Sequence, residues 1–261
     1  MDLHLQDKVV IITGGAKGIG EAITRCFASE GCRVVVANRS TEAGIALVAE
    51  LKEAGAAAHF VQAELREEPA CRRVIDETIE QFGGIDVLVH NAGGNDAVGL
   101  DRSPDDFMRS IENNLLHVYT LTHLAQESLK ERKGCIVNVG SKVVDTGQGH
   151  TSGYAAAKGG MNALTREWAV DLAPHGIRVN TVVPAEVWTP MYERWLNSLE
   201  GSAEVRKGIE QLIPLERRFT TSEEIADTVT FLASDRSSHT TGQIIYVDGG
   251  YTHLDRAFTS T

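Results

Sequence analysis

A tyrosine and a lysine four residues apart, Tyr154 and Lys158, are the pair in this sequence best suited to proton transfer. They lie in or beside an alanine-rich segment, 155–163, whose high helix propensity places both side chains on one face of a helix. An ammonium group beside a phenol favours the phenolate, so we expect Lys158 to lower the pKa of Tyr154 from its free value of about 10. Tyr154 could then act as a general acid or base.

A serine upstream of this pair could act on the same substrate oxygen. Ser141 follows an apolar, strand-like run over 135–139 and could hydrogen-bond that oxygen from the other side. The Tyr-x-x-x-Lys spacing alone is unspecific, and a surface helix with an extended lysine would explain it as well. The upstream sequence therefore decides between the two interpretations.

A glycine-rich turn near the N-terminus has the composition of a phosphate-binding loop. The apolar run 8–12 leads into Thr13-Gly-Gly-Ala-Lys-Gly-Ile-Gly20, and a helix should continue over 21–30. Glycines at 14, 18 and 20 would let backbone N–H groups and the helix N-terminus approach a pyrophosphate. An ordinary strand-to-helix turn is the alternative. A second apolar run at 33–37 completes a βαβ unit and favours the dinucleotide site.

The residues after the second strand bear on the choice between NADP and NAD. Asn38-Arg39-Ser40 stands where an acidic residue would bind the adenosine ribose of NAD. Arg39 and Lys17 could instead pair with a 2'-phosphate, so we expect NADP, with NAD possible. The alternative for Arg39 is an ordinary solvated surface residue.

The rest of the chain alternates between strands and helices without long linkers or internal repeats. We expect helices over 41–54, about 67–82, 104 to about 130, through 155–163 to about 173, and 221–234, and strands over 57–62, 85–90, 135–139, 176–183 and 243–249. Capping boxes are expected at Ser103 with Asp106 and at Thr221 with Glu224. This pattern predicts one α/β domain over 1–261 with a doubly wound parallel sheet. The irregular segment 190–218 is expected to form a lid over substrate.

Composition limits the class of partner. The net charge of −11 and the scarcity of basic clusters argue against nucleic acid and anionic membranes and favour a small molecule. No apolar run approaches the roughly 20 residues that span a bilayer, and we expect a cytoplasmic protein. The four cysteines form no Cys-x-x-Cys pair, which favours buried thiols. His117 and His123 lie six residues apart, which is not metal-ligand spacing, so no metal site is expected.

An ordered set of motifs along essentially the whole chain resembles the short-chain dehydrogenase/reductase family. The set comprises Thr13-Gly-x-x-x-Gly-Ile-Gly20, Asn91-Ala-Gly93, Asn114, Ser141, Tyr154-x-x-x-Lys158 and Asn180-x-x-x-Pro184. The resemblance implies a Rossmann-type fold, NAD(P) binding, hydride transfer at the pro-S face of the nicotinamide, and a homotetramer. It also implies that Tyr154 is the acid/base, that Lys158 lowers its pKa and holds the nicotinamide ribose, that Ser141 orients the reacting oxygen, and that Asn114 anchors a water of the proton relay.

The same resemblance assigns a set of residues to the cofactor. They are Gly14, Ala16, Lys17, Gly18, Ile19, Gly20, Asn38, Arg39, Ser40, Glu64, Leu65, Asn91, Ala92, Gly93, Tyr154, Lys158, Pro184, Val187 and Thr189. Four positions depart from the family's usual pattern: His90 replaces Asn, Glu64 replaces Asp, Gly140 replaces Ser and Ala185 replaces Gly. The imidazole of His90 would have to make sheet-bracing hydrogen bonds that an asparagine usually makes.

Within the family, several segments resemble bacterial L-fucose dehydrogenases, namely 95–100, 146–149, 184–190, 238–243 and 248–256. This implies oxidation of the anomeric carbon of an aldose, L-fucose or a similar sugar, to the lactone. The candidate substrate residues are Asn95, Lys142, Gln148, His150, Glu186 and Trp188, the last covering the C–H face of a pyranose. The alternative for Lys142 and Trp188 is exposure to solvent. His253 and Arg256 are expected to close the pocket, either of the same chain or of a neighbouring subunit. The alternatives are a 3-oxoacyl or other carbonyl reductase and a catalytically idle, dinucleotide-sensing regulator. The intact set of Asn114, Ser141, Tyr154 and Lys158 speaks against the regulator.

Overall fold

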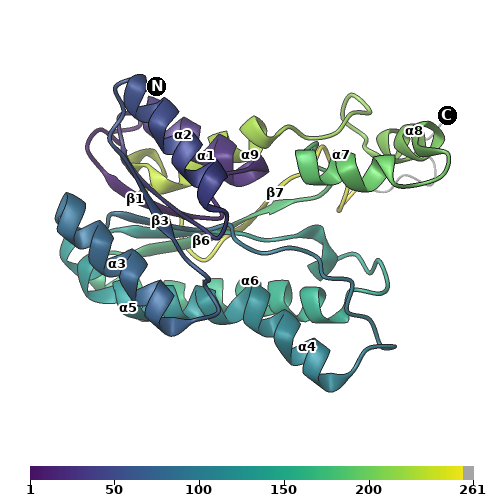
Figure 1. Cartoon of the computed structure of the whole chain (residues 1–261), viewed down its shortest axis with the longest axis horizontal. Coiled ribbons are helices and arrows are strands. Elements are labelled where there is room, and N and C mark those ends of the chain that lie inside the picture. The colour runs from purple at the N-terminus through teal and green to yellow at the C-terminus, as the bar shows by residue number, and fades with distance from the viewer. Residues whose placement is uncertain (255–261) are drawn as a thin grey trace.

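Seven parallel strands form one central sheet in the order β3-β2-β1-β4-β5-β6-β7. The computed structural model describes residues 1–254, and Figure 1 shows helices on both faces of the sheet. The strands are β1 (Val9–Thr13), β2 (Arg33–Asn38), β3 (Ala58–Gln62), β4 (Val87–His90), β5 (Cys135–Val139), β6 (Arg178–Pro184) and β7 (Ile244–Val247). The predicted doubly wound parallel sheet of about seven strands is confirmed.

The helices form two layers around the sheet. Helices α1, α2 and α9 cover one face and α3, α5 and α6 cover the other, while α4, α7 and α8 extend past the strand ends (Figure 1). Their bounds are α1 (Gly18–Ser29), α2 (Thr41–Glu53), α3 (Glu68–Phe82), α4 (Pro104–Ile111), α5 (His117–Arg132), α6 (Ser152–Leu172), α7 (Pro190–Asn197), α8 (Ser202–Leu212) and α9 (Ser222–Ala233).

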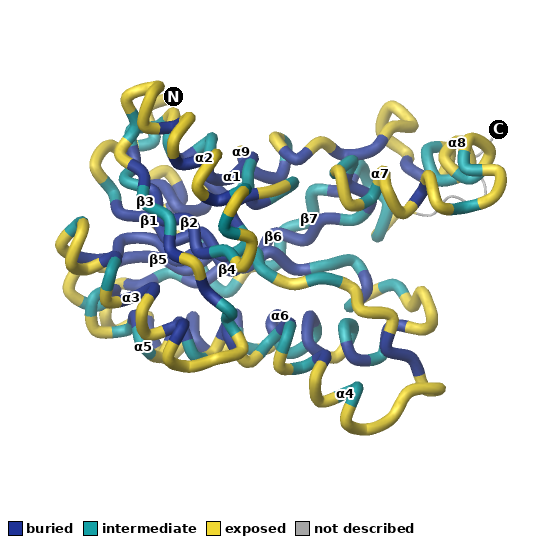
Figure 2. Tube along the Cα trace, in the orientation of Figure 1, coloured by how far each residue is buried: buried dark blue, intermediate teal, exposed yellow. Residues whose placement is uncertain are grey.

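Valine and isoleucine dominate the strands because helices cover both faces of the sheet. All five residues of β1 are buried. Ile23 and Phe27 of α1 fill the core on one side, and Leu121 and Leu129 of α5 fill it on the other. Figure 2 shows the buried segments gathered along the strands and the exposed ones on the outer helices. This packed core fixes the strand ends from which the site loops leave.

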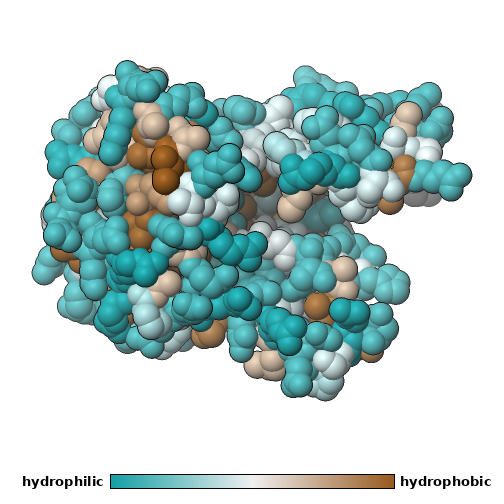
Figure 3. Space-filling view, in the orientation of Figure 1, coloured by the Kyte–Doolittle hydropathy of each residue, from teal (hydrophilic) through white to brown (hydrophobic). Residues whose placement is uncertain are grey.

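The carboxyl ends of the strands meet at one edge, and the strand order reverses between β1 and β4. Loops leave such a switch point in opposite directions, which opens a crevice for ligands. The molecular surface is hollowed on this side, between the part that contains α7 and α8 and the part that contains α4 and α6 (Figure 3). The glycine-rich turn, the loop after β4 and Ser141 all follow strands that end at this edge.

One predicted helix was wrong in its continuity. The expected helix from 104 to about 130 is divided by a π-helix, Glu112–Leu116, between α4 and α5. The segment 190–218, expected to be the least regular part of the chain with one helical stretch, contains two helices, α7 and α8. Other predicted boundaries differ from the structure by a few residues at most. Both capping boxes, at Ser103 and at Thr221, are confirmed.

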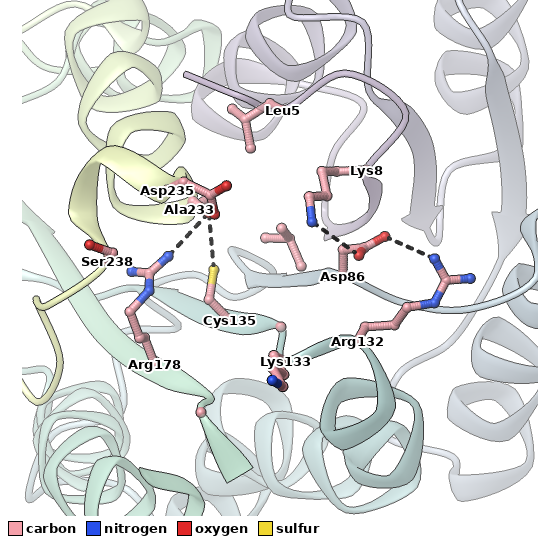
Figure 4. Close-up of a pocket in the computed structure, with 13 residues that line it drawn as sticks. Leu5, Lys8, Asp86, Arg132, Lys133, Cys135, Arg178, Ala233, Asp235 and Ser238 are labelled. Carbon is pink, nitrogen blue, oxygen red and sulfur yellow. Dashed lines mark hydrogen bonds and ion pairs between the residues drawn. The ribbon is translucent and has the colours of Figure 1, made fainter. Parts of the chain in front are cut away.

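The amino ends of the strands form the opposite edge, where a small cavity of about 160 Å³ lies (Figure 4). Asp86 is its central group: the carboxylate accepts a hydrogen bond from the N–H of Val9 at 2.9 Å. The same carboxylate pairs with Lys8 at 3.6 Å and Arg132 at 3.8 Å. These contacts tie the starts of β1 and β4 together, and we assign this cluster a structural role.

Three further observations concern residues 1–254. None of their helices combines the length and apolar character that crossing a lipid bilayer would require. Within that range there is no group of three or more His, Cys, Asp or Glu side chains placed to hold a metal ion. All four cysteines are free, and the predicted thiols are confirmed, with three buried and Cys26 half-buried.

Candidate active site

Tyr154 and Lys158 lie in the first two turns of α6, where the sequence placed them. The Nζ of Lys158 is 5.8 Å from the centre of the Tyr154 ring, so the two side chains share a face. Lys158 is buried and donates a hydrogen bond of 2.7 Å to the carbonyl oxygen of Val139, the last residue of β5. This bond fixes the start of α6 against the end of a central strand.

The electrostatics of this pair differ from the expectation. Burial raises the pKa of Tyr154, and the carboxylate of Asp96 adds to the rise, while a hydrogen bond with Ser141 opposes it. Burial alone lowers the pKa of Lys158 to about 8. The expected lowering of the Tyr154 pKa by Lys158 is therefore not found in this structure. The ammonium group is bonded to the Val139 carbonyl, and removal of the phenol from water dominates.

Ser141 follows β5 directly and caps the short 3₁₀ turn Lys142–Val144. Its hydroxyl accepts a hydrogen bond from the N–H of Val143 at 3.4 Å and also bonds with the phenol of Tyr154. A hydroxyl group can donate one hydrogen bond and accept two. The structure therefore brings Ser141 and Tyr154 together, as predicted, so that both could contact one substrate oxygen.

Asn114 lies inside the π-helix, and its buried amide has two partners. The Oδ1 atom accepts from the N–H of Gly94 at 2.8 Å, and Nδ2 donates to the carbonyl of Ser110 at 3.0 Å. A Cβ added at Gly93 would lie 2.8 Å from that Oδ1 atom, so glycine is needed there. A π-helical turn often marks a functional site. The amide thus holds the loop after β4 in place, and anchoring of a water stays a prediction.

The glycine-rich turn is shaped by close backbone contacts. Gly14 and Gly18 have φ of 64° and 55°, which favour glycine, and a Cβ at Gly20 would lie only 2.1 Å from the carbonyl oxygen of Gly14. Lys17 occupies the N-cap of α1. A lysine side chain cannot accept hydrogen bonds from the first helical turn, which suits a helix start whose N–H groups bind a phosphate.

The loops after β1 and β4 are bonded to each other at the switch point. The Thr13 hydroxyl accepts from the N–H groups of Asn91 and Ala92, both at 3.0 Å. The Asn91 side chain donates to the carbonyls of Thr13 and Gly14 at 3.0 and 3.2 Å. A dinucleotide bound along this crevice would therefore meet a preorganised backbone. The residues present fit NAD(P), and the glycine turn is where its pyrophosphate would be held.

The ribose end of the predicted cofactor site is more open. Asn38 donates to the carbonyl of Ser40 at 3.1 Å, and Arg39 is largely exposed, with 83% of its side chain accessible. An Nη atom of Arg39 lies 3.8 Å from the carboxylate of Glu64, which also contacts Arg66. Arg39 is thus long, accessible and loosely paired, as a residue that receives a phosphate would be.

The other predicted cofactor residues lie at different depths. Ala16 is buried, and Ile19 and Leu65 are partly buried against the two cores. Thr189 lies beside the glycine turn, because a Cβ at Gly18 would be 3.5 Å from its side chain. Pro184 ends β6, and Val187 forms a parallel bridge with Thr220. These residues bring the loop after β6 next to the turn after β1.

His90, which departs from the family pattern, is buried beside a second histidine. Its Nε2 atom hydrogen-bonds with the hydroxyl of Thr122 at 3.0 Å, so it makes one contact between β4 and α5. Burial lowers the pKa of His90, and burial lowers that of His117 to about 4. Both are therefore neutral at physiological pH. The imidazole supplies part of the bracing that an asparagine would supply.

Of the predicted substrate residues, the structure pairs Lys142 with Glu186. They form an ion pair whose side chains are only 13% and 9% exposed. Asn95, Gln148 and His150 lie exposed on the loops after β4 and β5. Trp188 packs in an aromatic cluster, 5.2 Å from Phe219, with the Arg206 guanidinium 4.3 Å from its ring centre. One face of Trp188 is therefore covered by Arg206.

His253 packs edge-on against Tyr246, with ring centres 4.3 Å apart. Arg256 lies outside the described residues.

Sequence reasoning missed two polar residues of this region. Asp96 accepts a hydrogen bond of 2.8 Å from the hydroxyl of Ser110, and its negative charge helps to raise the pKa of Tyr154. Tyr192, on α7, donates to Glu186 at 2.6 Å. The signals for them in the sequence were weak: Asp96 is next to the predicted Asn95, and Tyr192 lies in the predicted lid. Neither position predicts a contact. Only the folded loops bring them to this cleft.

The chain is similar to known proteins over nearly its whole length. A family model described as "Enoyl-(Acyl carrier protein) reductase" matches residues 14–252. The 3-oxoacyl-(acyl-carrier-protein) reductase FabG of Thermotoga maritima is 38% identical over 95% of this chain and 99% of its own. L-fucose dehydrogenase of Bos taurus is 35% identical over 96% and 91%. The crystal structure of Cj0485 dehydrogenase superposes with a TM-score of 0.94 at 44% identity over 99% of both chains. The chain belongs to the short-chain dehydrogenase/reductase family.

Proposed function

We propose that this protein is an NADP-dependent dehydrogenase that oxidises the anomeric carbon of an aldose, L-fucose or a similar sugar, to the lactone. The arrangement of Ser141, Tyr154 and Lys158 supports the reaction class. The observation that supports a sugar substrate is the buried ion pair between Lys142 and Glu186. Lys142 is the residue directly after Ser141. Such a pair suits a substrate that carries hydroxyl groups.

The reaction divides between the side chains as follows. NADP, held by the glycine turn, would supply the acceptor for the hydride that leaves the anomeric carbon. Tyr154 takes the proton of the anomeric hydroxyl, and Ser141 hydrogen-bonds the same oxygen as it becomes a carbonyl oxygen. Lys158 supplies positive charge beside the phenol, and Asn114 fixes the loop after β4. The raised pKa of Tyr154 means that oxidation should become faster as the pH rises.

Charge in the cleft supports a sugar over an acyl chain. Asp96, Lys142 and Glu186 come from the loops after three neighbouring strands, β4, β5 and β6. Each group already has a partner in the protein, Asp96 the Ser110 hydroxyl and Lys142 and Glu186 each other, so a sugar would add hydrogen bonds to charged groups that are held in place. A polyhydroxylated ring can offer every one of them a hydrogen bond.

A 3-oxoacyl reductase is the second candidate, and one observation favours it. A phenol with a raised pKa stays protonated at neutral pH and is ready to donate a proton to a carbonyl. The similarity to FabG, at 38% identity, points the same way. A catalytically idle regulator has less support, because Asn114, Ser141, Tyr154 and Lys158 are all present and Tyr154 lies close to both Ser141 and Lys158.

Three further features of the proposal follow from position and resemblance. Arg39 and Lys17 favour NADP over NAD. Segment 190–218, which contains α7 and α8, acts as a lid beside the hollow seen in Figure 3. The chain assembles as a homotetramer, which light scattering of the purified protein would test.

Product identification tests the proposed function. The purified chain with NADP and L-fucose should give a sugar lactone, followed by the sugar acid on hydrolysis, in NMR spectra of the reaction mixture. A sugar left unchanged, together with reduction of a 3-oxoacyl thioester by NADPH, would replace this proposal with the reductase. Cofactor binding without turnover of any alcohol or carbonyl would favour the regulator.

A further inference from the structure

The Lys142–Glu186 ion pair is largely buried, where charged groups lose the hydration that water gives them. Its side chains are 13% and 9% exposed, and removing two charges from water is unfavourable before their attraction is counted. A buried pair is therefore weak evidence for a stabilising role. Its two residues come from the loops after β5 and β6, adjacent strands whose carboxyl ends face the crevice. That location suggests a role in binding.

The carboxylate of Glu186 is held from several directions. Lys142 donates to Oε1, and the hydroxyl of Tyr192 donates to Oε2 at 2.6 Å. The backbone of Glu186 is also fixed, because its carbonyl accepts from the N–H of Thr220 at 3.0 Å. A carboxylate has about four acceptor positions. The two side-chain donors use two of them and set the plane of the group.

The walls around this carboxylate combine charge with aromatic surface. The Nζ of Lys142 lies 4.2 Å from the centre of the Tyr251 ring. Tyr192 packs edge-on against Phe219 and Trp195, each with ring centres 5.2 Å apart. A sugar ring has hydroxyl groups at its rim and C–H groups on its faces, so it complements an oriented carboxylate bordered by aromatic rings.

We propose that Glu186 determines specificity by accepting hydrogen bonds from two neighbouring ring hydroxyls of the substrate, and that Lys142 and Tyr192 orient its carboxylate for this contact. The inference rests on the proposed function and narrows it to substrates with a vicinal diol. A thioester or a steroid alcohol lacks such a pair of donors. Glu186 therefore contributes to recognition of the ring, whereas Ser141 and Tyr154 act on the reacting oxygen.

Two hemiacetals with the same reacting carbon separate these roles. L-fucose carries ring hydroxyls, whereas 2-hydroxytetrahydropyran is the bare cyclic hemiacetal. In Glu186→Gln, kcat/KM for L-fucose should fall about 10- to 100-fold, as expected for loss of hydrogen bonds to a charged group. The value for 2-hydroxytetrahydropyran should stay within about threefold, since no ring hydroxyl is present to bind.

Two further variants separate recognition from folding. Tyr192→Phe keeps the carboxylate and removes one orienting bond, so it should show a smaller loss in the same direction, about 3- to 10-fold on L-fucose. Glu193→Gln changes an exposed carboxylate on the same helix and serves as the matched control. NADP binding, followed by fluorescence, and the unfolding midpoint report whether each variant is folded.

Equal losses on both hemiacetals in Glu186→Gln and in Tyr192→Phe would overturn the inference, because a mere brace of the Ser141 loop affects every substrate alike. If Glu186→Gln left the ratio of kcat/KM for L-fucose to kcat/KM for 2-hydroxytetrahydropyran unchanged while L-fucose was still oxidised, the inference would also be overturned. The proposed function would then remain intact. A wild-type protein that oxidises neither hemiacetal, yet reduces a 3-oxoacyl thioester, would overturn the proposed function and the inference together.

Discussion

The ammonium nitrogen of Lys158 lies 5.8 Å from the centre of the Tyr154 ring, and Lys158 is buried while Tyr154 is partly buried. Burial disfavours the charged form of each, so it raises the pKa of the phenol and lowers that of the amine to about 8. The two pKa values therefore separate, and that of the phenol lies above that of the amine. Tyr154 is therefore protonated at neutral pH, and Lys158 releases its proton at lower pH than Tyr154 does.

The phenol of Tyr154 should be essential to turnover and dispensable for cofactor binding. Tyr154→Phe removes the proton-transfer group and leaves the glycine turn unchanged, so the rate should fall at least about 10²- to 10⁴-fold. Stopped-flow or steady-state rates with NADP, alongside a binding titration, check both parts. Retention of more than about a tenth of the wild-type rate would remove Tyr154 from its proposed role.

Lys158 should make the protein less stable near neutral pH than an apolar residue would. Its pKa is about 8 when folded, against an ordinary value of 10.5, so the unfolded chain binds the proton more tightly. The free energy of unfolding should then rise between pH about 8 and about 10.5, by up to about 3 kcal/mol.

Lys158→Met should lose this rise, gain stability at pH 7 and lose activity. Urea unfolding at several pH values measures the slope, with Lys52→Met on the surface of α2 as the control for loss of a lysine. An unchanged slope in Lys158→Met would contradict the assignment.

Asp96 should contribute to the pH dependence of oxidation. Burial is the main cause of the raised pKa of Tyr154, the Ser141 hydrogen bond opposes it, and the Asp96 carboxylate adds repulsion. Asp96→Asn should therefore lower the pKa of Tyr154 and shift the rising limb of kcat/KM for oxidation to lower pH. Asp105→Asn, an exposed acid on α4, is the matched control. A shift to higher pH, or an equal shift in both variants, would be inconsistent with this contact.

Arg39 should select the phosphorylated cofactor. A charge-assisted contact with the 2'-phosphate is worth roughly 1.5 to 3 kcal/mol, or about 10- to 100-fold in efficiency. Arg39→Ala should reduce the NADP to NAD ratio of kcat/KM by that factor. The nearby Arg66→Ala, which also removes a partner of Glu64, tests whether the effect is specific. If the ratio does not change in Arg39→Ala, the arginine does not bind the phosphate.

Local signals in the sequence were sufficient to predict the sheet and the elements on which the candidate site residues lie. The apolar strand at 9–13, the glycine turn that follows and the four-residue step from Tyr154 to Lys158 each depend on residues close in sequence. Capping at Ser103 and Thr221 is likewise local and was predicted correctly. Parallel strand pairing then follows from the βα alternation.

Local sequence patterns could not predict contacts between residues that are far apart in the chain. The π-helix around Asn114 depends on the buried amide reaching Gly94 in another loop, so helical periodicity alone gave a continuous helix. The direction of the Tyr154 pKa depends on burial and on Asp96, whose place no spacing rule predicts. Glu186 and Tyr192 meet only because α7 folds back toward the end of β6.

The most direct test of the account is a single panel of substrates under one set of conditions. The wild-type protein would be assayed with L-fucose, D-arabinose, L-galactose and a 3-oxoacyl thioester, each with NADP(H) and NAD(H), by the absorbance of the reduced nicotinamide. We expect the highest kcat/KM for the three sugars with NADP, because they share most of their ring stereochemistry. Three inert sugars beside rapid reduction of the thioester would contradict the sugar assignment.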